Sequence, residues 1–73
     1  MTEKRVQELA EKVVSKRLPQ LEENNQQAYF YGIANILRET IVNDYYINDI
    51  REDSTVTEMM EVDLERLIES LGL

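Results

Sequence analysis

Histidine, cysteine and tryptophan are absent from this 73-residue chain, and glycine and proline are scarce, at two residues and one. Without cysteine the chain has no disulfide and no thiol nucleophile. Without histidine it lacks a common zinc ligand and the commonest general base at neutral pH. We therefore expect no metal, no cofactor and no enzymatic activity.

Long apolar runs are missing as well. The longest uncharged stretch, from Asn24 to Leu37, contains several amide side chains, whereas a membrane span needs about 20 mostly apolar residues. The first residues alternate charged and apolar side chains and lack the apolar region of a signal peptide. We expect a cytoplasmic protein with no membrane partner.

The composition predicts one small folded domain over residues 1–73. Hydrophobic residues make up 42% of the chain, which is well above the range of disordered sequences. A disulfide-free chain of this size rarely obtains more than roughly 3–5 kcal/mol from its core. Association with a second copy would add buried surface, so a homodimer is expected.

Hydrophobic periodicity predicts an all-α fold, a three-helix bundle with helices over residues 2–18, 21–44 and 55–71. The first helix should stop near Arg17, because Pro19 disfavours helical dihedral angles in the residue before it. The predicted core is formed by Val6, Leu9, Val13, Ile33, Leu37, Ile41, Leu64, Leu67, Ile68 and Leu71.

The ends of the third helix carry recognisable signals. Thr55 and Glu58 have the spacing of a capping box, which satisfies free amide groups at a helix start. Gly72 suits the left-handed position that follows a helix, and Leu73 would then pack against Ile68. These residues predict where the last helix begins and ends.

Residues 45–54 are ambiguous. The segment mixes aromatic, β-branched and turn-forming residues, and we expect an irregular loop. The alternative is a short β-pair between residues 45–47 and 55–57 across the charged turn. Its carboxylates fail the pattern of a calcium loop, because Asp49 stands where glycine is required and Thr55 where a bidentate glutamate is required.

Charge is distributed unevenly along the chain. Residues 1–20 carry five basic and three acidic groups, whereas residues 21–73 carry three basic and twelve acidic ones. The third helix has an acidic face formed by Glu58, Glu61, Glu65 and Glu69. The last two lie near the negative end of the helix dipole and repel each other, so they require a positive partner or solvent.

Three explanations of the acidic face remain open. Lys12, Lys16 and Arg17 of the first helix would pair with it if the first and third helices run parallel. Alternatively the face meets a basic protein surface and acts as a nucleic-acid mimic, or it is simply solvated. Direct nucleic-acid binding is disfavoured by the net charge of −7.

Some apolar side chains remain after the core has been assigned. If Ile33 and Leu37 face inward, one outer stripe of the second helix holds apolar and polar residues, namely Tyr31, Asn35, Arg38 and Val42. Met59 and Val62 lie on the side of the third helix away from Leu64. The alternative is a wider core in which the second helix lies between both neighbours.

The resulting hypothesis is a small acidic, non-enzymatic protein-interaction domain, a homodimeric regulatory or accessory factor. Its predicted interface consists of Tyr31, Asn35, Arg38, Val42, Met59 and Val62. The alternative function is an acidic decoy that occupies the basic site of a nucleic-acid-binding protein. Salt distinguishes the two, because apolar contacts persist at high salt and charge pairing is screened.

Overall fold

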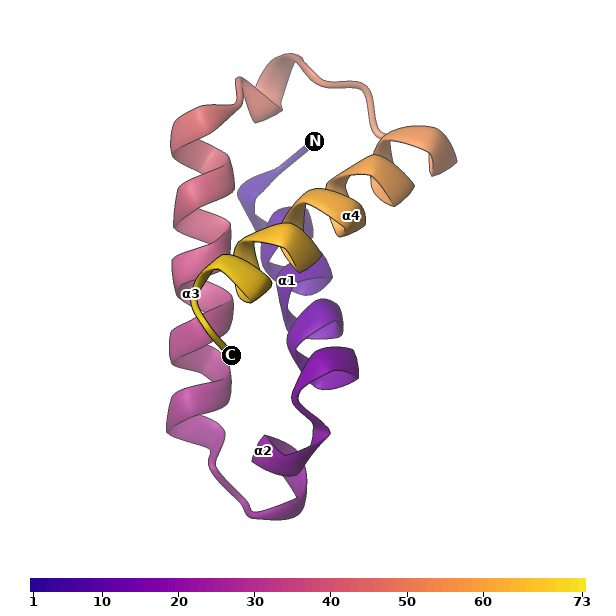
Figure 1. Cartoon of the computed structure of the whole chain (residues 1–73). Coiled ribbons are helices and arrows are strands. Elements are labelled where there is room, and N and C mark those ends of the chain that lie inside the picture. The colour runs from indigo at the N-terminus through magenta and orange to yellow at the C-terminus, as the bar shows by residue number, and fades with distance from the viewer.

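The computed structural model describes residues 1–73 and contains helices but no strand, so the predicted all-α class is confirmed (Figure 1). The elements, in chain order, are α1 (Glu3–Arg17), α2 (Pro19–Glu23), α3 (Gln27–Asp44), a single 3-10 turn η1 (Ile47–Asp49) and α4 (Ser54–Ser70). The loop predicted between the last two long helices is present with η1 inside it, and the β-pair is absent.

The first helix follows its sequence signals. Thr2 is the N-cap, and its side chain accepts a hydrogen bond from the backbone N–H of Arg5 at 3.1 Å. The helix ends at Arg17, as Pro19 predicts, and Pro19 itself occupies the first turn of α2, where a missing N–H costs nothing.

The prediction of one continuous helix over residues 21–44 is wrong. The short α2 ends at Glu23, and α3 begins only at Gln27. Between them Asn25 has a φ of 55°, and the backbone N–H of Gln26 returns to the carbonyl of Leu21 at 2.7 Å. Asparagine tolerates this left-handed conformation better than most residues, so it ends the short helix and turns the chain.

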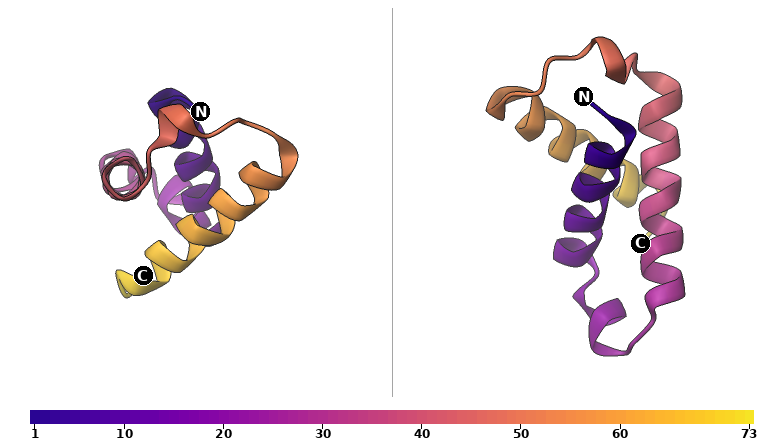
Figure 2. Two further views of the ribbon diagram at one scale, coloured as in Figure 1. Left: turned by 90° about the horizontal axis from the view of Figure 1, so that it is seen from above. Right: turned by 180° about the vertical axis from the view of Figure 1, so that it is seen from behind.

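The α1 and α3 helices run antiparallel, joined by α2 at one end, and α4 crosses one face of this pair. Figure 1 shows α4 in front of the pair, and Figure 2 shows it behind when the molecule is turned round. Ala10 and Ala34 are completely buried, and their small side chains allow close packing of helices.

The core holds fifteen buried residues, all of them hydrophobic. Seven of the ten predicted members are confirmed, namely Val6, Leu9, Val13, Leu37, Ile41, Leu64 and Ile68. The core also contains residues outside the prediction, among them Phe30, Ala34, Ile47 and Met60.

Three predicted core residues are not fully buried. Ile33 is half-buried, because Phe30, Ala34, Leu37 and Ile41 form the buried face of α3 and leave it on the flank. Leu67 is half-buried on the flank of α4 for the same geometric reason. The remaining one, Leu71, is 45% exposed because it follows the last residue of α4 at Ser70.

The predicted capping box at Thr55 is wrong, since α4 begins one residue earlier, at Ser54. Asp53 is the N-cap and accepts the backbone N–H of Val56 at 2.9 Å. An ionised carboxylate at this position also interacts favourably with the helix dipole. At the other end Gly72 has the predicted left-handed conformation, with a φ of 78°, but Leu73 stays largely exposed, contrary to the packing expected on Ile68.

The start of the chain is held against the loop that precedes α4. The terminal amino group of Met1 donates a hydrogen bond to the carbonyl of Ile50, and the Arg5 guanidinium pairs with Glu52 at 2.6 Å. This ion pair and a second one to Glu8 raise the pKa of Arg5 above its ordinary value. The loop is thereby connected to α1, and its own residue Ile47 is buried in the core.

Candidate functional site

The side of α4 that faces away from the other helices exposes two large apolar residues. Met60, Leu64 and Ile68 point into the core, which leaves Met59 and Val62 on the opposite side. Met59 is 63% exposed and Val62 is 47% exposed. Their exposure leaves a short apolar stripe on this helix without a partner in the folded chain.

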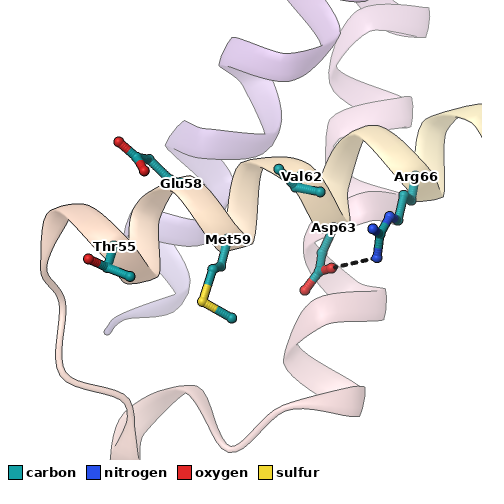
Figure 3. A pocket seen from close by; sticks show the side chains of 6 residues that line it. All are labelled: Thr55, Glu58, Met59, Val62, Asp63 and Arg66. Carbon is teal, nitrogen blue, oxygen red and sulfur yellow. Dashed lines mark ion pairs between the residues drawn. The ribbon is translucent and has the colours of Figure 1, made fainter.

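These two residues lie in an open hollow of about 390 Å³ that is lined by α4 alone. We name its lining the α4 outer face, which consists of Thr55, Glu58, Met59, Val62, Asp63 and Arg66. Figure 3 shows Val62 near the middle of the face, with Glu58 towards the start of the helix and Arg66 towards its end. The face therefore has an apolar centre and charged margins of both signs.

A second hollow, of about 320 Å³, adjoins the α4 outer face between α4 and the end of α3. It shares Asp63 and Arg66 with the first hollow and is otherwise lined by Ile41, Asp44, Tyr45, Leu67 and Ser70. The Tyr45 hydroxyl donates a hydrogen bond to Asp63 at 2.7 Å, and the Arg66 guanidinium lies 3.9 Å from the same carboxylate. Tyr45 and Asp63 thus connect the two hollows with a polar bridge.

The hydrogen bond to Asp63 is the main reason why the pKa of Tyr45 lies above its ordinary value of 10.0. Partial burial of the ring and repulsion by Asp63 and Asp44 act in the same direction, whereas Arg66 opposes them. The hydroxyl is therefore held in its protonated form, as a hydrogen-bond donor to the carboxylate.

The acidic face is largely paired within the molecule. Lys12 lies 2.9 Å from Glu61, Lys16 lies 3.0 Å from Glu65 and Arg17 lies 2.6 Å from Glu69, and these three pairs connect α1 with α4. The α4 helix crosses α1 at an angle, but both run in the same general direction, and this brings each cation opposite a glutamate on the neighbouring helix (Figure 1). Of the four predicted acidic residues, only Glu58 forms no ion pair.

The residues predicted as one interface lie on two sides of the molecule. Tyr31 is 50% exposed and Asn35 is exposed, whereas Arg38 and Val42 are half-buried. Asn35 and Arg38 line a hollow of about 300 Å³ with residues of α1, namely Glu3, Lys4 and Gln7.

That hollow lies on the far side of α1 from α4. Nine residues separate Gln7 from Lys16, which pairs with α4, and this corresponds to about two and a half turns of helix. The two side chains therefore point in opposite directions. The structure does not bring the predicted α3 stripe together with Met59 and Val62.

The carboxylates of the loop do not gather into a cluster. No group of three or more acidic side chains in the chain is placed to hold a metal ion. Asp53 caps α4, and Glu52 pairs with Arg5. None of the helices combines the length and the apolar character that crossing a bilayer requires.

Three residues of the site, Tyr45, Asp63 and Arg66, were not predicted from the sequence. Asp63 and Arg66 follow Val62 by one and four residues, so their place beside the exposed stripe could have been found from helical spacing. Tyr45 could not, because it lies after the end of α3 and reaches Asp63 only through the path of the following loop.

No protein-family model, curated protein or solved structure matches the chain. A function must therefore be inferred from the shape and chemistry of the exposed faces.

Proposed function

We propose that the chain is a non-enzymatic protein-binding domain and that the α4 outer face is its contact surface. The observation that carries the proposal is the exposure of Met59 and Val62 side by side on one helix face, within an open hollow. Both side chains lose their remaining contact with water if another helix packs there. Because each is already partly buried, the gain is smaller than the roughly 1.5–3 kcal/mol of a fully exposed side chain, before the costs of association.

The distribution of polarity on this face is typical of an interface. Protein interfaces have an apolar centre surrounded by polar groups, and methionine and arginine are enriched in them. Met59 and Val62 form such a centre, and Glu58, Asp63 and Arg66 surround it. Tyr46 in the loop stands singly among the exposed apolar residues, which is normal for a protein surface. Tyr29 and Ile36 of α3 also share one helix face, with the half-buried Ile33 between them, but no hollow with charged margins is found there.

The same hollow is poorly suited to catalysis. It is open and lined by a single helix, so it cannot exclude water from a reacting group. The nearest side chain with a shifted pKa is Tyr45. Because its pKa is raised, even less of the phenolate form is present at neutral pH to act as a general base. These features favour binding over chemistry at this site.

The alternative of an acidic decoy is less well supported. Glu61, Glu65 and Glu69 already pair with cations of α1, so a basic protein would have to displace these pairs. Only Glu58 of the acidic face stays unpaired. An array of phosphate-like charges needs several free carboxylates, and this face offers one.

Affinity capture from an extract of the cells that make the protein tests the proposal. Wild type is immobilised beside Val62→Glu and Tyr31→Glu, two variants whose mutated side chains have similar exposure, 47% and 50%. We expect wild type and Tyr31→Glu to retain the same proteins at high salt and Val62→Glu to lose them. Equal capture by all three would contradict the proposal, and loss of every captured protein at high salt would support the decoy.

A further inference from the structure

We infer that the partner of the α4 outer face is a second copy of this chain, packed antiparallel through a two-fold axis at Val62. The inference rests on the proposed function and names the occupant of the proposed contact surface. It is carried by the positions of the two charged residues that lie at equal distances from Val62 along α4.

Glu58 lies four residues before Val62, and Arg66 lies four residues after it. Each separation is slightly more than one helical turn, so both side chains lie on nearly the same side of the helix as Val62. Glu58 forms no ion pair within the chain. The Arg66 side chain is 77% exposed, and its one ion-pair partner, Asp63, lies at the long distance of 3.9 Å.

A two-fold axis through Val62 makes this arrangement self-complementary. In an antiparallel pair, residues at equal distances before and after the axis lie level with each other. Glu58 of each copy then lies level with Arg66 of the second copy, which gives two such pairs in the dimer. A closed two-fold contact uses the same patch on both subunits, as this one does.

The apolar residues fit the same register. Thr55, Met59, Val62 and Arg66 are separated by four, three and four residues, the spacing at which one helix face packs along another. Val62 would contact Val62 of the second copy, and Met59 would lie beside the aliphatic part of Arg66 of that copy. With 17 residues, α4 is about 25 Å long, enough for several turns of contact.

The charges on the face favour a second copy over an unlike partner. A face with carboxylates alone would require a basic partner. This face also holds a cation, Arg66, on the other side of Val62 from Glu58 along the helix. The net charge of −7 on each copy opposes dimerisation. That repulsion is limited because salt screens charges beyond about 8 Å under physiological conditions. The acidic residues closest to the face along α4, Glu61, Glu65 and Glu69, also each have a cation of α1 beside them.

Sedimentation equilibrium at tens of micromolar tests the inference. Wild type is expected to sediment with twice the monomer mass of 8.6 kDa. Val62→Glu places two like charges at the axis and is expected to raise the dimer Kd at least about 100-fold. Tyr31→Glu is the matched control, on the side of the molecule away from α4, and is expected to keep the wild-type Kd.

Reversing the charges tests the register. Glu58→Arg and Arg66→Glu each create like-charge pairs and are expected to weaken the dimer about tenfold. The double variant restores opposite charges at the same positions, keeps the net charge of −7, and is expected to recover the wild-type Kd. Circular dichroism checks that each variant keeps its helices, and the double variant keeps the test valid if Val62→Glu does not fold.

Three results would overturn the inference. A wild-type monomer at these concentrations excludes the homodimer, and the affinity capture described above then decides separately whether the face binds another protein. If Tyr31→Glu disrupts the dimer and Val62→Glu does not, the interface lies on the side of α3 that holds Tyr31 and not on the α4 outer face. A dimer weakened by both charge reversals but not recovered in the double variant has a different register.

Discussion

The inner and outer faces of α4 differ in how completely other residues of the folded chain cover their apolar side chains and pair with their charges. On the inner face Met60, Leu64 and Ile68 are buried, and the neighbouring glutamates pair with α1. On the outer face Met59 and Val62 remain exposed, although they are as apolar as the residues of the inner face. One short helix thus contains a face completed by its own chain and a face left without a partner.

The difference shows which unusual features of the sequence are explained by contacts within the folded chain. Glu65 and Glu69 oppose the helix dipole, but Lys16 and Arg17 lie against them, so their placement is explained within the monomer. No residue of the chain covers Met59 and Val62 in the same way. The exposed apolar pair therefore indicates a partner more strongly than the glutamates do, because no contact within the monomer explains it.

The largest expected difference between the faces is in stability. Leu64→Ala leaves a cavity in the core and should lower the free energy of unfolding by about 2–5 kcal/mol. Val62→Ala removes an exposed side chain and should change the stability of the monomer by less than about 0.5 kcal/mol. Urea unfolding at low micromolar concentration measures both, and a similar loss in the two variants would mean that the outer face is part of the monomer core.

A smaller effect is expected for the ion pairs of the inner face. Glu65→Gln removes the pair with Lys16, whose side chain is largely exposed, so stability should change by less than about 1 kcal/mol. Adding salt should reduce even this difference. Stabilisation by more than about 1 kcal/mol would indicate that Glu65 is unpaired in solution and destabilises the folded monomer. That result would favour a role for the glutamate in binding an external basic partner.

The smallest effect concerns the polar bridge at the edge of the outer face. Because the pKa of Tyr45 is raised in the folded state, its contribution to stability is present below pH 10.0 and is lost as the pH rises through the folded value. Ultraviolet titration should show one tyrosine that ionises late. Tyr45→Phe should remove this ionisation and Asp63→Asn should move it to lower pH, whereas an unchanged curve in Asp63→Asn would exclude the hydrogen bond as the cause.

Much of the fold could be predicted because helical periodicity is a local property. The spacing of Val6, Leu9 and Val13 identified the buried face of α1 correctly. The break at Asn25 was missed, since an asparagine in an otherwise helical pattern does not by itself require a left-handed residue. Ala34 was missed because its small size matters only once α1 packs close to it.

The candidate site was predictable in part for the same reason. The exposed position of Met59 and Val62 follows from the assignment of Leu64 to the core, which needs only the geometry of one helix. The separation of this pair from Tyr31 depends on which side of the α1 and α3 pair α4 covers, and no local pattern determines that. The bridge from Tyr45 to Asp63 likewise depends on the path of the loop.

The most direct test of the α4 outer face as a dimer interface uses the absence of cysteine from the natural chain. In Val62→Cys the two introduced thiols would face each other at the two-fold axis, and in Tyr31→Cys they would lie far from it. Mild oxidation at micromolar concentration should convert most of Val62→Cys, and little of Tyr31→Cys, into a covalent dimer on a non-reducing gel. Equal and slow cross-linking of the two variants, or faster cross-linking of Tyr31→Cys, would contradict this account.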